Sequence, residues 1–329
     1  MMNTVKKIVP LGLILILFSC SDDSGSDTVD FDRGPILENL ANNIIVPSYE
    51  NLVSTTDVLI TETESFVQDR SEQNLTDVKD AWLNARLSWK TSEAFTFGPI
   101  DQRFLDTKMD LFPISIVGLQ NAIADFDGSD DYLNLVGSDK KGFGAMEYLL
   151  FAGTDEEILQ RFEDEKYQGY LRLLSVDVNS IAETVLNDWN TSYTTEFIAN
   201  TGNDAGASIT LYTNDMIELV EIIKNFKLSI PFGTRTGTDP FPDLVESPHA
   251  GLSKQLILQN LDVVEEIFTG ATGSGLDDYL NTLNISLDDG QPLSEAILDQ
   301  IEECRRLTNA LTDLKDDVVN QPDNVQALI

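Results

Sequence analysis

The sequence has few of the side chains from which most zinc and nucleophilic sites are built. Its 329 residues include two cysteines, Cys20 and Cys304, and one histidine, His249. A catalytic zinc site needs about three protein ligands, most often His or Cys, and a Ser-His-Asp triad needs a histidine beside a nucleophile. No H-E-x-x-H motif is present. These shortages exclude a zincin site, and we interpret His249 as an incidental surface residue.

Positive charge is also scarce, with 21 Lys and Arg against 56 Asp and Glu and a formal net charge of −35. Such a chain repels phosphate backbones and anionic lipid surfaces. We therefore expect no nucleic-acid partner, whereas cations and basic partners would be attracted. Because an excess of carboxylates is also the ordinary composition of a solvated surface, we interpret most of this acidity as serving solubility.

The chain has no apolar run long enough to span a bilayer, and its one strongly apolar stretch lies at the start. Residues 1–19 have the pattern of a secretion signal, with Lys6 and Lys7 before an apolar core that ends at Phe18. Leu17-Phe18-Ser19-Cys20 resembles a bacterial lipobox, in which Cys20 is lipidated. We therefore expect an outer-membrane lipoprotein, periplasmic or surface-exposed, whose membrane contact is the lipid anchor alone.

Residues 20–34 are predicted to be an acidic flexible tether. With Cys20 lipidated, Cys304 stands alone, and no internal disulfide is expected. Beyond the tether we find no alternating strand pattern. Apolar residues recur instead at helical spacing. They predict helices over 35–45, 49–70, 76–97, 157–200, 208–228, 252–268 and 293–319.

The helical pattern predicts an all-α protein with two packed bundle-like halves, 35–185 and 186–329. The helix over 76–97 is the most informative. Trp82, Arg86, Trp89 and Glu93 are spaced i, i+4, i+7 and i+11, and fall within about 60° of one another on a helix. The two tryptophans mark this face as core-directed. Arg86 and Glu93 are therefore predicted to line a polar pocket, with a buried ion pair that fixes helix register as the alternative.

A second buried charge is expected in residues 141–151. As a helix, this stretch places Glu147 beside Phe143, Leu150 and Phe151. A carboxylate on an apolar face must be paired, protonated or bound to a cation, because burying a bare charge is too costly. Glu147 and Glu93 are our candidate metal ligands. The alternative for Glu147 is an ion pair with an arginine of a neighbouring helix.

The third segment is a long loop, Pro231 to Pro248, rich in Pro, Gly and Thr. Loops of this length are often functional. We expect Ser247 to be the N-cap of the next helix and Pro248 its first residue. A helix N-terminus flanked by hydroxyl groups suits an anionic ligand group, although plain capping is the simpler explanation of Ser247.

These three segments resemble the imelysin-like family, once described as insulin-cleaving membrane proteases. Residues 142–147 are similar to its GxHxxE signature, with Gly144 where the family has histidine. The helix carrying Trp82, Arg86 and Glu93 is similar to a second element, which ends in a Phe-Gly turn. Glu246, Ser247 and Ser253 match a third, in which His249 stands where an aromatic residue is usual.

The resemblance covers most of residues 35–320 and implies two four-helix bundles with a site in the cleft between them. The implied cleft residues are Arg86, Trp89, Glu93, Gly142, Gly144, Glu147, Glu246, Ser247 and Ser253. The family's iron-regulated members imply a non-catalytic binding lipoprotein of iron or haem acquisition, acting with outer-membrane iron transport proteins. Carboxylates and hydroxyls suit hard cations such as ferric iron or calcium.

Two alternatives stay open. One is a metallopeptidase, the historic family activity, against which the glycine at position 144 weighs because it offers no side-chain ligand. The other is a surface interaction module whose cleft is only architecture.

Overall fold

Helices supply the regular secondary structure of residues 31–329, the part of the chain that the computed structural model describes. Within that part there is no named strand, and one isolated bridge pairs Ser286 with Pro292. The predicted all-α class is confirmed. The predicted signal segment, Cys20 and most of the tether lie outside the described residues. None of the described helices is both long and apolar enough to cross a membrane.

The longest helices come from the first two thirds of the chain. A nearly continuous helix is formed by α1 (Gly34–Asn39), a π-helical segment η1 (Leu40–Ile45) and α2 (Val46–Gln68). Pro47 lies in the first turn of α2, and its missing N–H removes one i→i−4 hydrogen bond, which accounts for the wider turns just before it. The other helices of this part are α3 (Glu72–Ser92), α4 (Asp106–Met109), α5 (Ile116–Asp125), α6 (Gly142–Phe151), α7 (Asp155–Arg161), α8 (Glu165–Asp188) and α9 (Thr194–Ala199).

The last third of the chain forms a second group of helices. They are α10 (Ser208–Ile222), which continues as the π-helical segment η6 (Ile223–Leu228), and then α11 (Ser229–Phe232), α12 (Ser253–Thr269), α13 (Leu276–Thr282), α14 (Leu293–Ala310), α15 (Leu314–Asn320) and α16 (Pro322–Leu328). The helix predicted over 293–319 is therefore broken between Ala310 and Leu314, where Leu311 takes an extended conformation and Asp313 caps α15.

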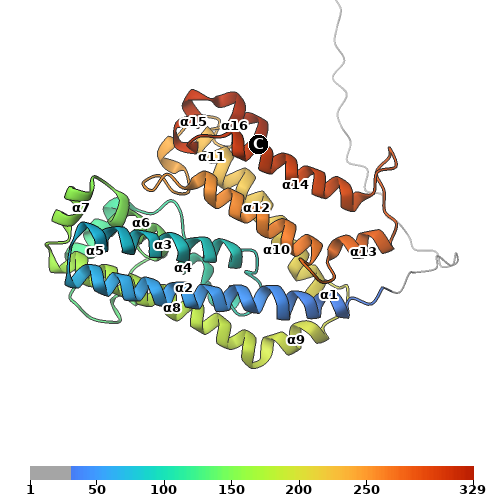
Figure 1. Ribbon diagram of the computed structural model, residues 1–329, viewed down its shortest axis with the longest axis horizontal. Helices are drawn as coiled ribbons and strands as arrows, with labels where there is room; N and C mark the ends of the chain where they lie inside the picture. The colour runs from blue at the N-terminus through green and yellow to red at the C-terminus, as the bar shows by residue number, and fades with distance from the viewer. Residues whose placement is uncertain (1–30) are drawn as a thin grey trace, which may run out of the picture. The chain divides into compact units, whose positions relative to one another are not determined.

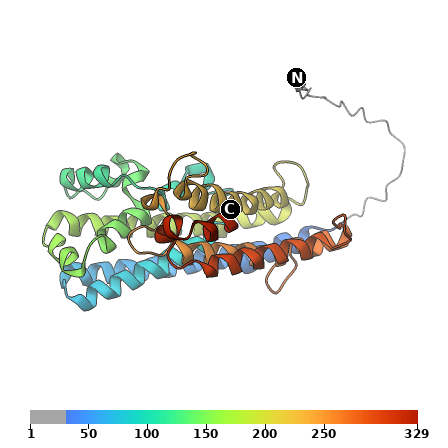
Figure 2. The same cartoon turned by 90° about the horizontal axis from the view of Figure 1, so that it is seen from above.

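In Figure 1, α2 and α3 run side by side, with α8 along the other side of α2. Figure 2, seen from above, shows α8 and α2 again as neighbours. The short helix α6 packs across α8 and α3, and α12 packs against both α3 and α14. Residues 31–329 cluster as one compact unit, and the predicted boundary between residues 185 and 186 stays a prediction.

The start of α6 depends on a glycine. Gly142 has a φ of +70°, and a Cβ at this position would overlap the carbonyl oxygen of Met109. Only glycine combines this conformation with so close a backbone approach. Gly142 therefore sets the direction in which α6 leaves the preceding loop, and so the position of Glu147.

Candidate functional site

Helix α3 and its C-cap residue, Glu93, carry three charged residues inward on one face. Arg86, Lys90 and Glu93 are spaced i, i+4 and i+7, beside the buried Trp82 and Trp89. The side chains of Arg86 and Lys90 are 0% exposed, and that of Glu93 is 14% exposed. Buried charges must be compensated at close range, so the partners of these three residues define the site.

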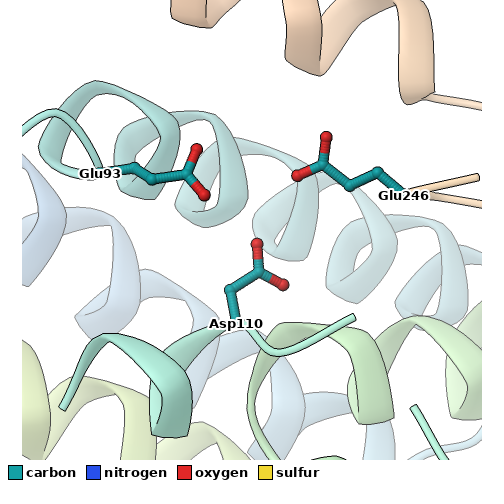
Figure 3. Close-up of side chains that lie close together, drawn as sticks. All are labelled: Glu93, Asp110 and Glu246. Atoms are coloured by element: carbon teal, nitrogen blue, oxygen red, sulfur yellow. The ribbon is translucent and has the colours of Figure 1, made fainter. Parts of the chain in front are cut away.

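The Lys90 ammonium lies among three carboxylates that come from three segments of the chain. Its Nζ is 2.8 Å from Glu93 Oε1, 2.7 Å from Asp110 Oδ2 and 2.6 Å from Glu246 Oε1. Figure 3 shows the three carboxylates pointing toward one another. We call Glu93, Asp110 and Glu246 the acidic triad. Lys90 supplies the positive charge at its centre.

Arg86 joins the triad to Glu147. Its Nη2 is 3.2 Å from Asp110 Oδ1, and its Nη1 donates to Glu147 Oε2 at 3.1 Å. The other oxygen of Glu147 accepts the backbone N–H groups of His249 and Ala250, at 2.9 and 3.1 Å. Glu147 therefore fastens α3, α6 and the loop before α12 together. The arginine partner that the sequence left open is Arg86.

Lys227 closes the network from η6. Its Nζ lies 3.2 Å from Glu93 Oε2 and 3.2 Å from Glu246 Oε1, and it donates to Asn260 Oδ1 at 2.6 Å. Asn260 in turn donates to Glu93 Oε2 at 3.0 Å. We call the connected set the buried charge network. Its charged members are Arg86, Lys90, Lys227, Glu93, Asp110, Glu147 and Glu246.

Electrostatics keep Lys90 and Glu93 ionised despite their burial. Burial alone lowers the pKa of Lys90, but Asp110, Glu246 and Glu93 outweigh burial and raise that pKa above its ordinary value. Burial likewise raises the pKa of Glu93, but Lys227 and Lys90 lower it to about 2. With all groups charged, four carboxylates face three cations, so the network carries one net negative charge.

One hollow adjoins the network on the side of α6. Its volume is about 260 Å³, and Gly144, Glu147, Glu246 and His249 lie in its wall with an apolar rim that includes Ile114. We call it the signature hollow. Burial lowers the pKa of His249, more than Glu147 raises it, so its imidazole is neutral at pH 7. The histidine that the sequence marked as incidental is half-buried beside Glu147.

A second hollow adjoins the network on the side of α10. Its volume is about 410 Å³, and five carboxylates line it, those of Glu93, Asp106, Asp110, Asp215 and Glu218. Trp89 also lies in its wall, and no Lys or Arg is among the described residues that line it. We call it the acidic hollow. Burial raises the pKa of Asp215 to about 6 and raises that of Asp106.

The structure brings most of the predicted cleft residues together. Arg86, Glu93, Glu147 and Glu246 meet in the buried charge network, Trp89 lies in the acidic hollow, and Gly144 lies in the signature hollow.

Ser247 and Ser253 are buried, and Ser247 N donates to Ser253 Oγ at 3.3 Å. The prediction that Ser247 caps the next helix is wrong. Helix α12 begins at Ser253 with Leu252 at its N-cap, because residues 248–251 form a turn that ends at Gly251, with a φ of +69°.

Four members of the site were missed in the sequence, namely Lys90, Asp110, Lys227 and Asn260. A signal existed for Lys90, because it stands four residues after Arg86 on the same face of the predicted helix. Asp110 lies in a loop without periodicity, and Lys227 lies in a π-helical segment.

The predicted metal ligands, Glu93 and Glu147, belong to different parts of the network. Within residues 31–329, the acidic triad is the one group of three acidic, His or Cys side chains whose ligand atoms lie within 4.8 Å of one another, and Glu147 is not a member. Three carboxylates are a suitable donor set for a hard cation. The Lys90 ammonium lies at their centre, so an ion binds there only in exchange for it.

Comparison with known proteins places this geometry in context. The family model described as Imelysin matches residues 45–329. The iron-regulated protein A of Synechococcus elongatus is 29% identical over 154 residues, which are 46% of this chain and 39% of that protein. The match thus spans about two fifths of the length of this relative.

Two solved structures share the fold. A crystal structure of an iron-regulated protein A precursor from Parabacteroides distasonis has a TM-score of 0.77 at 19% identity, covering 94% of this chain and 93% of that one. An imelysin-like protein from Psychrobacter arcticum has a TM-score of 0.71 at 18% identity, covering 90% and 91%. At these identities the likeness shows the fold alone.

Proposed function

This chain belongs to the imelysin family, and from that premise we propose that it is a non-catalytic, lipid-anchored binding protein of the cell envelope that works in iron acquisition. The relative from Synechococcus and the structural neighbour from Parabacteroides are both described as iron-regulated protein A. We infer that the ligand is a hard cation, with iron the first candidate, and that it binds at the acidic triad.

The observation that carries this proposal is the place of the Lys90 ammonium. It lies 2.6 to 2.8 Å from one oxygen of each triad carboxylate, at the centre of the group. Lys90 thus already places a unit positive charge between the three carboxylates, and Lys227 and Arg86 contact them from outside. An ion of higher charge gains more from the same carboxylates, because the Coulomb energy scales with the product of the charges.

This site differs from a preformed metal centre because an ion must replace the Lys90 ammonium in order to bind. The ammonium group of Lys90 is carried on a flexible four-carbon side chain, so it can move aside. Glu93 and Asp110 line the acidic hollow, and this hollow gives an ion a route to the triad. When the Lys90 ammonium withdraws, the space between the triad carboxylates is open to an ion, with Lys227 and Arg86 still beside them. Carboxylate oxygens are the ligands that ferric iron and calcium prefer. Binding is therefore expected to be reversible, as a carrier requires.

The geometry favours binding over catalysis. Both oxygens of Glu147 accept hydrogen bonds from Arg86, His249 and Ala250, so this carboxylate has no free role as a general base. His249 belongs to no group of three metal ligands among the described residues. The signature hollow, at about 260 Å³, is below the roughly 300–1,000 Å³ of sites for drug-sized molecules, which disfavours haem in that hollow.

Lipid attachment and location are part of the same proposal. The lipobox-like segment that ends at Cys20 supports an outer-membrane lipoprotein, periplasmic or surface-exposed, held by its lipid rather than by a spanning helix. A carrier in this position would pass iron to or from outer-membrane iron transport proteins. Radiolabelled palmitate tests the anchor, since a Cys20→Ala variant should incorporate none.

Calorimetric titration tests the cation site. The soluble protein, residues 31–329, is titrated with ferric nitrilotriacetate and with Mn²⁺. We expect binding of one ion, at least ten-fold weaker in Glu246→Gln, which keeps the shape of the side chain but removes its charge. Glu156→Gln, an exposed carboxylate on α7, is the matched control and should bind like the wild type. If the wild-type protein binds neither ion, the acidic triad is not a cation site.

The metallopeptidase alternative has a separate test. The protein is incubated with an unfolded protein substrate, with and without a chelator, and fragments are followed by mass spectrometry. The binding proposal expects no cleavage in either case. Chelator-sensitive cleavage that is lost in Glu147→Gln would revive the peptidase.

A further inference from the structure

The acidic hollow differs from the triad in how its charges are compensated. Glu93 and Asp110 face the ammonium groups of Lys90 and Lys227. Asp106, Asp215 and Glu218 line the same hollow, yet none of the ion pairs within residues 31–329 includes them. The hollow therefore contains three carboxylates that no cationic side chain of the described residues neutralises.

Trp89 supplies an independent sign of a ligand. It is 1% exposed and lies in the wall of the acidic hollow, and its indole Nε1 has no hydrogen-bond partner among the described residues. A buried indole N–H usually finds an acceptor, and leaving it without one is unfavourable. An acceptor atom of a molecule bound beside Trp89 would satisfy it.

The rest of the wall excludes a bare metal ion as the best fit. Leu111, Phe112, Leu219 and Ile222 contribute apolar surface, and Phe226, at 45% exposed, stands at the rim. Asp106, Asp215 and Glu218 form no group of three with ligand atoms within 4.8 Å in the described part of the chain. Carboxylates spread over an apolar wall suit a cation with an organic body.

We propose that the acidic hollow binds a small organic ammonium ion, whose amine lies against Asp215 and Asp106 and whose apolar body packs between Trp89 and Phe226. The Lys90 ammonium beside Glu93 and Asp110 shows the same chemistry on the neighbouring wall. Trp89, in the wall of the hollow, adds an aromatic surface to which an organic cation is attracted.

This proposal does not require the iron proposal to hold. The carboxylates assigned to the amine, Asp215 and Asp106, are not members of the triad, so either site can be lost by substitution without the other. Burial raises the pKa of Asp215 to about 6, because it disfavours the charged form of the carboxylate. The group is still mostly ionised at pH 7.5, and a bound cation would stabilise that charge.

Tyramine is the probe, because it joins an ammonium group to an aromatic ring with a phenolic oxygen as acceptor. Its matched neutral partner is tyrosol, in which a hydroxyl replaces the ammonium. Binding to residues 31–329 is measured at pH 7.5 by ligand-observed NMR and calorimetry. We expect tyramine to bind at least ten-fold more tightly than tyrosol, and Asp215→Asn to remove most of that difference.

Two further variants complete the test. Phe226→Ala should weaken tyramine and tyrosol alike, because it removes apolar wall and no charge, and Glu156→Gln, far along the chain on α7, should change neither. Asp215→Asn should leave the metal titration unchanged, which separates this site from the triad. Equal affinity for tyramine and tyrosol, no detectable binding of tyramine at millimolar concentration, or an unaffected Asp215→Asn variant would each overturn the proposal.

Discussion

The buried charge network and the acidic hollow lie side by side and share Glu93 and Asp110, yet they treat charge in opposite ways. In the network each carboxylate lies within about 3 Å of a cationic nitrogen. In the hollow, Asp106, Asp215 and Glu218 belong to no ion pair within residues 31–329, and Asp215 accepts a hydrogen bond from Thr96 Oγ1 at 3.0 Å. Compensated charges hold segments in register, whereas uncompensated carboxylates can pair with a cation from outside the chain. The comparison separates the carboxylates that this chain neutralises itself from those that it does not.

The largest expected effect comes from the centre of the network. Lys90→Met leaves three buried carboxylates without their shared cation, and breaking a buried ion pair in this way costs about 3–5 kcal/mol. Urea unfolding measures the loss. If the triad is a cation site, Mn²⁺ should restore much of the stability of this variant, because the ion takes the position that the ammonium has left.

The control for Lys90→Met is Lys79→Met. Lys79 pairs with Asp155 at 2.6 Å, but that carboxylate is 64% exposed, and exposed pairs contribute less than about 1 kcal/mol. Similar losses in the two variants would break the distinction between a structural network and ordinary surface pairing.

Glu147→Gln tests the part of the network that reaches the signature hollow. The amide oxygen can still accept the N–H groups of His249 and Ala250, while the ion pair with Arg86 is lost. Because Arg86 keeps Asp110, we expect a loss of about 2–3 kcal/mol. Slow hydrogen exchange of the His249 and Ala250 amides, followed by NMR, should persist in the variant. Fast exchange would mean that the charge itself holds the loop.

Removing a charge from the acidic hollow should stabilise the protein, whereas removing one from the network destabilises it. The pKa of Asp215 is raised by burial from 3.8 to about 6, so the folded state binds this proton more tightly than the unfolded chain does. Stability is therefore lost as pH rises from about 4 through 6, and Asp215→Asn removes that loss. With the partial exposure of the group discounted, the variant should gain about 1–2 kcal/mol above pH 6 and nothing below pH 4.

Urea unfolding at pH 4, 5, 6 and 8 measures this gain. The exposed Asp130 of the 127–131 loop supplies the control, because Asp130→Asn should leave the pH profile unchanged. A destabilising effect of Asp215→Asn at pH 8 would show that the carboxylate is part of the structural network after all.

The sequence predicted site residues that lie on regular helices. Arg86 and Glu93 were found because a regular helix fixes the angle between residues, and the tryptophans beside them identify the buried face. Glu147 was found because a charge within an apolar helix must be compensated. Convergence of these segments with Glu246 came from the family resemblance, since spacing along one helix says nothing of its neighbours.

Two of the site residues that the sequence did not predict lie outside regular α-helix. Asp110 follows the four-residue helix α4, and its place depends on the close approach of Gly142 to Met109. Lys227 lies in η6, where π-helical turns shift the angle per residue away from 100°. Asp215 differs, because it stands on the apolar face of α10 with the buried Leu219 at i+4, so the rule that found Glu147 could have found it too. Long-range packing decides the positions of Asp110 and Lys227, and one sequence does not encode it in a readable pattern.

The smallest effect concerns Gly144, in the wall of the signature hollow. A Cβ there would lie 2.7 Å from Ile114 Cγ2 and 3.3 Å from the Leu111 carbonyl oxygen. Gly144→Ala gains about 1 kcal/mol in helix propensity, and overpacking costs about 1–3 kcal/mol, so the net loss should be about 1 kcal/mol.

Truncating Ile114 to alanine removes the clashing methyl group and turns Gly144→Ala into a stabilising change. The coupling between the two positions, measured by urea unfolding of both single variants and the double variant, should reach about 1 kcal/mol. Strict additivity would mean that Ile114 does not close the space over position 144. The signature hollow would then have room for a side chain at that position, and Glu147 would have room for a second ligand beside it.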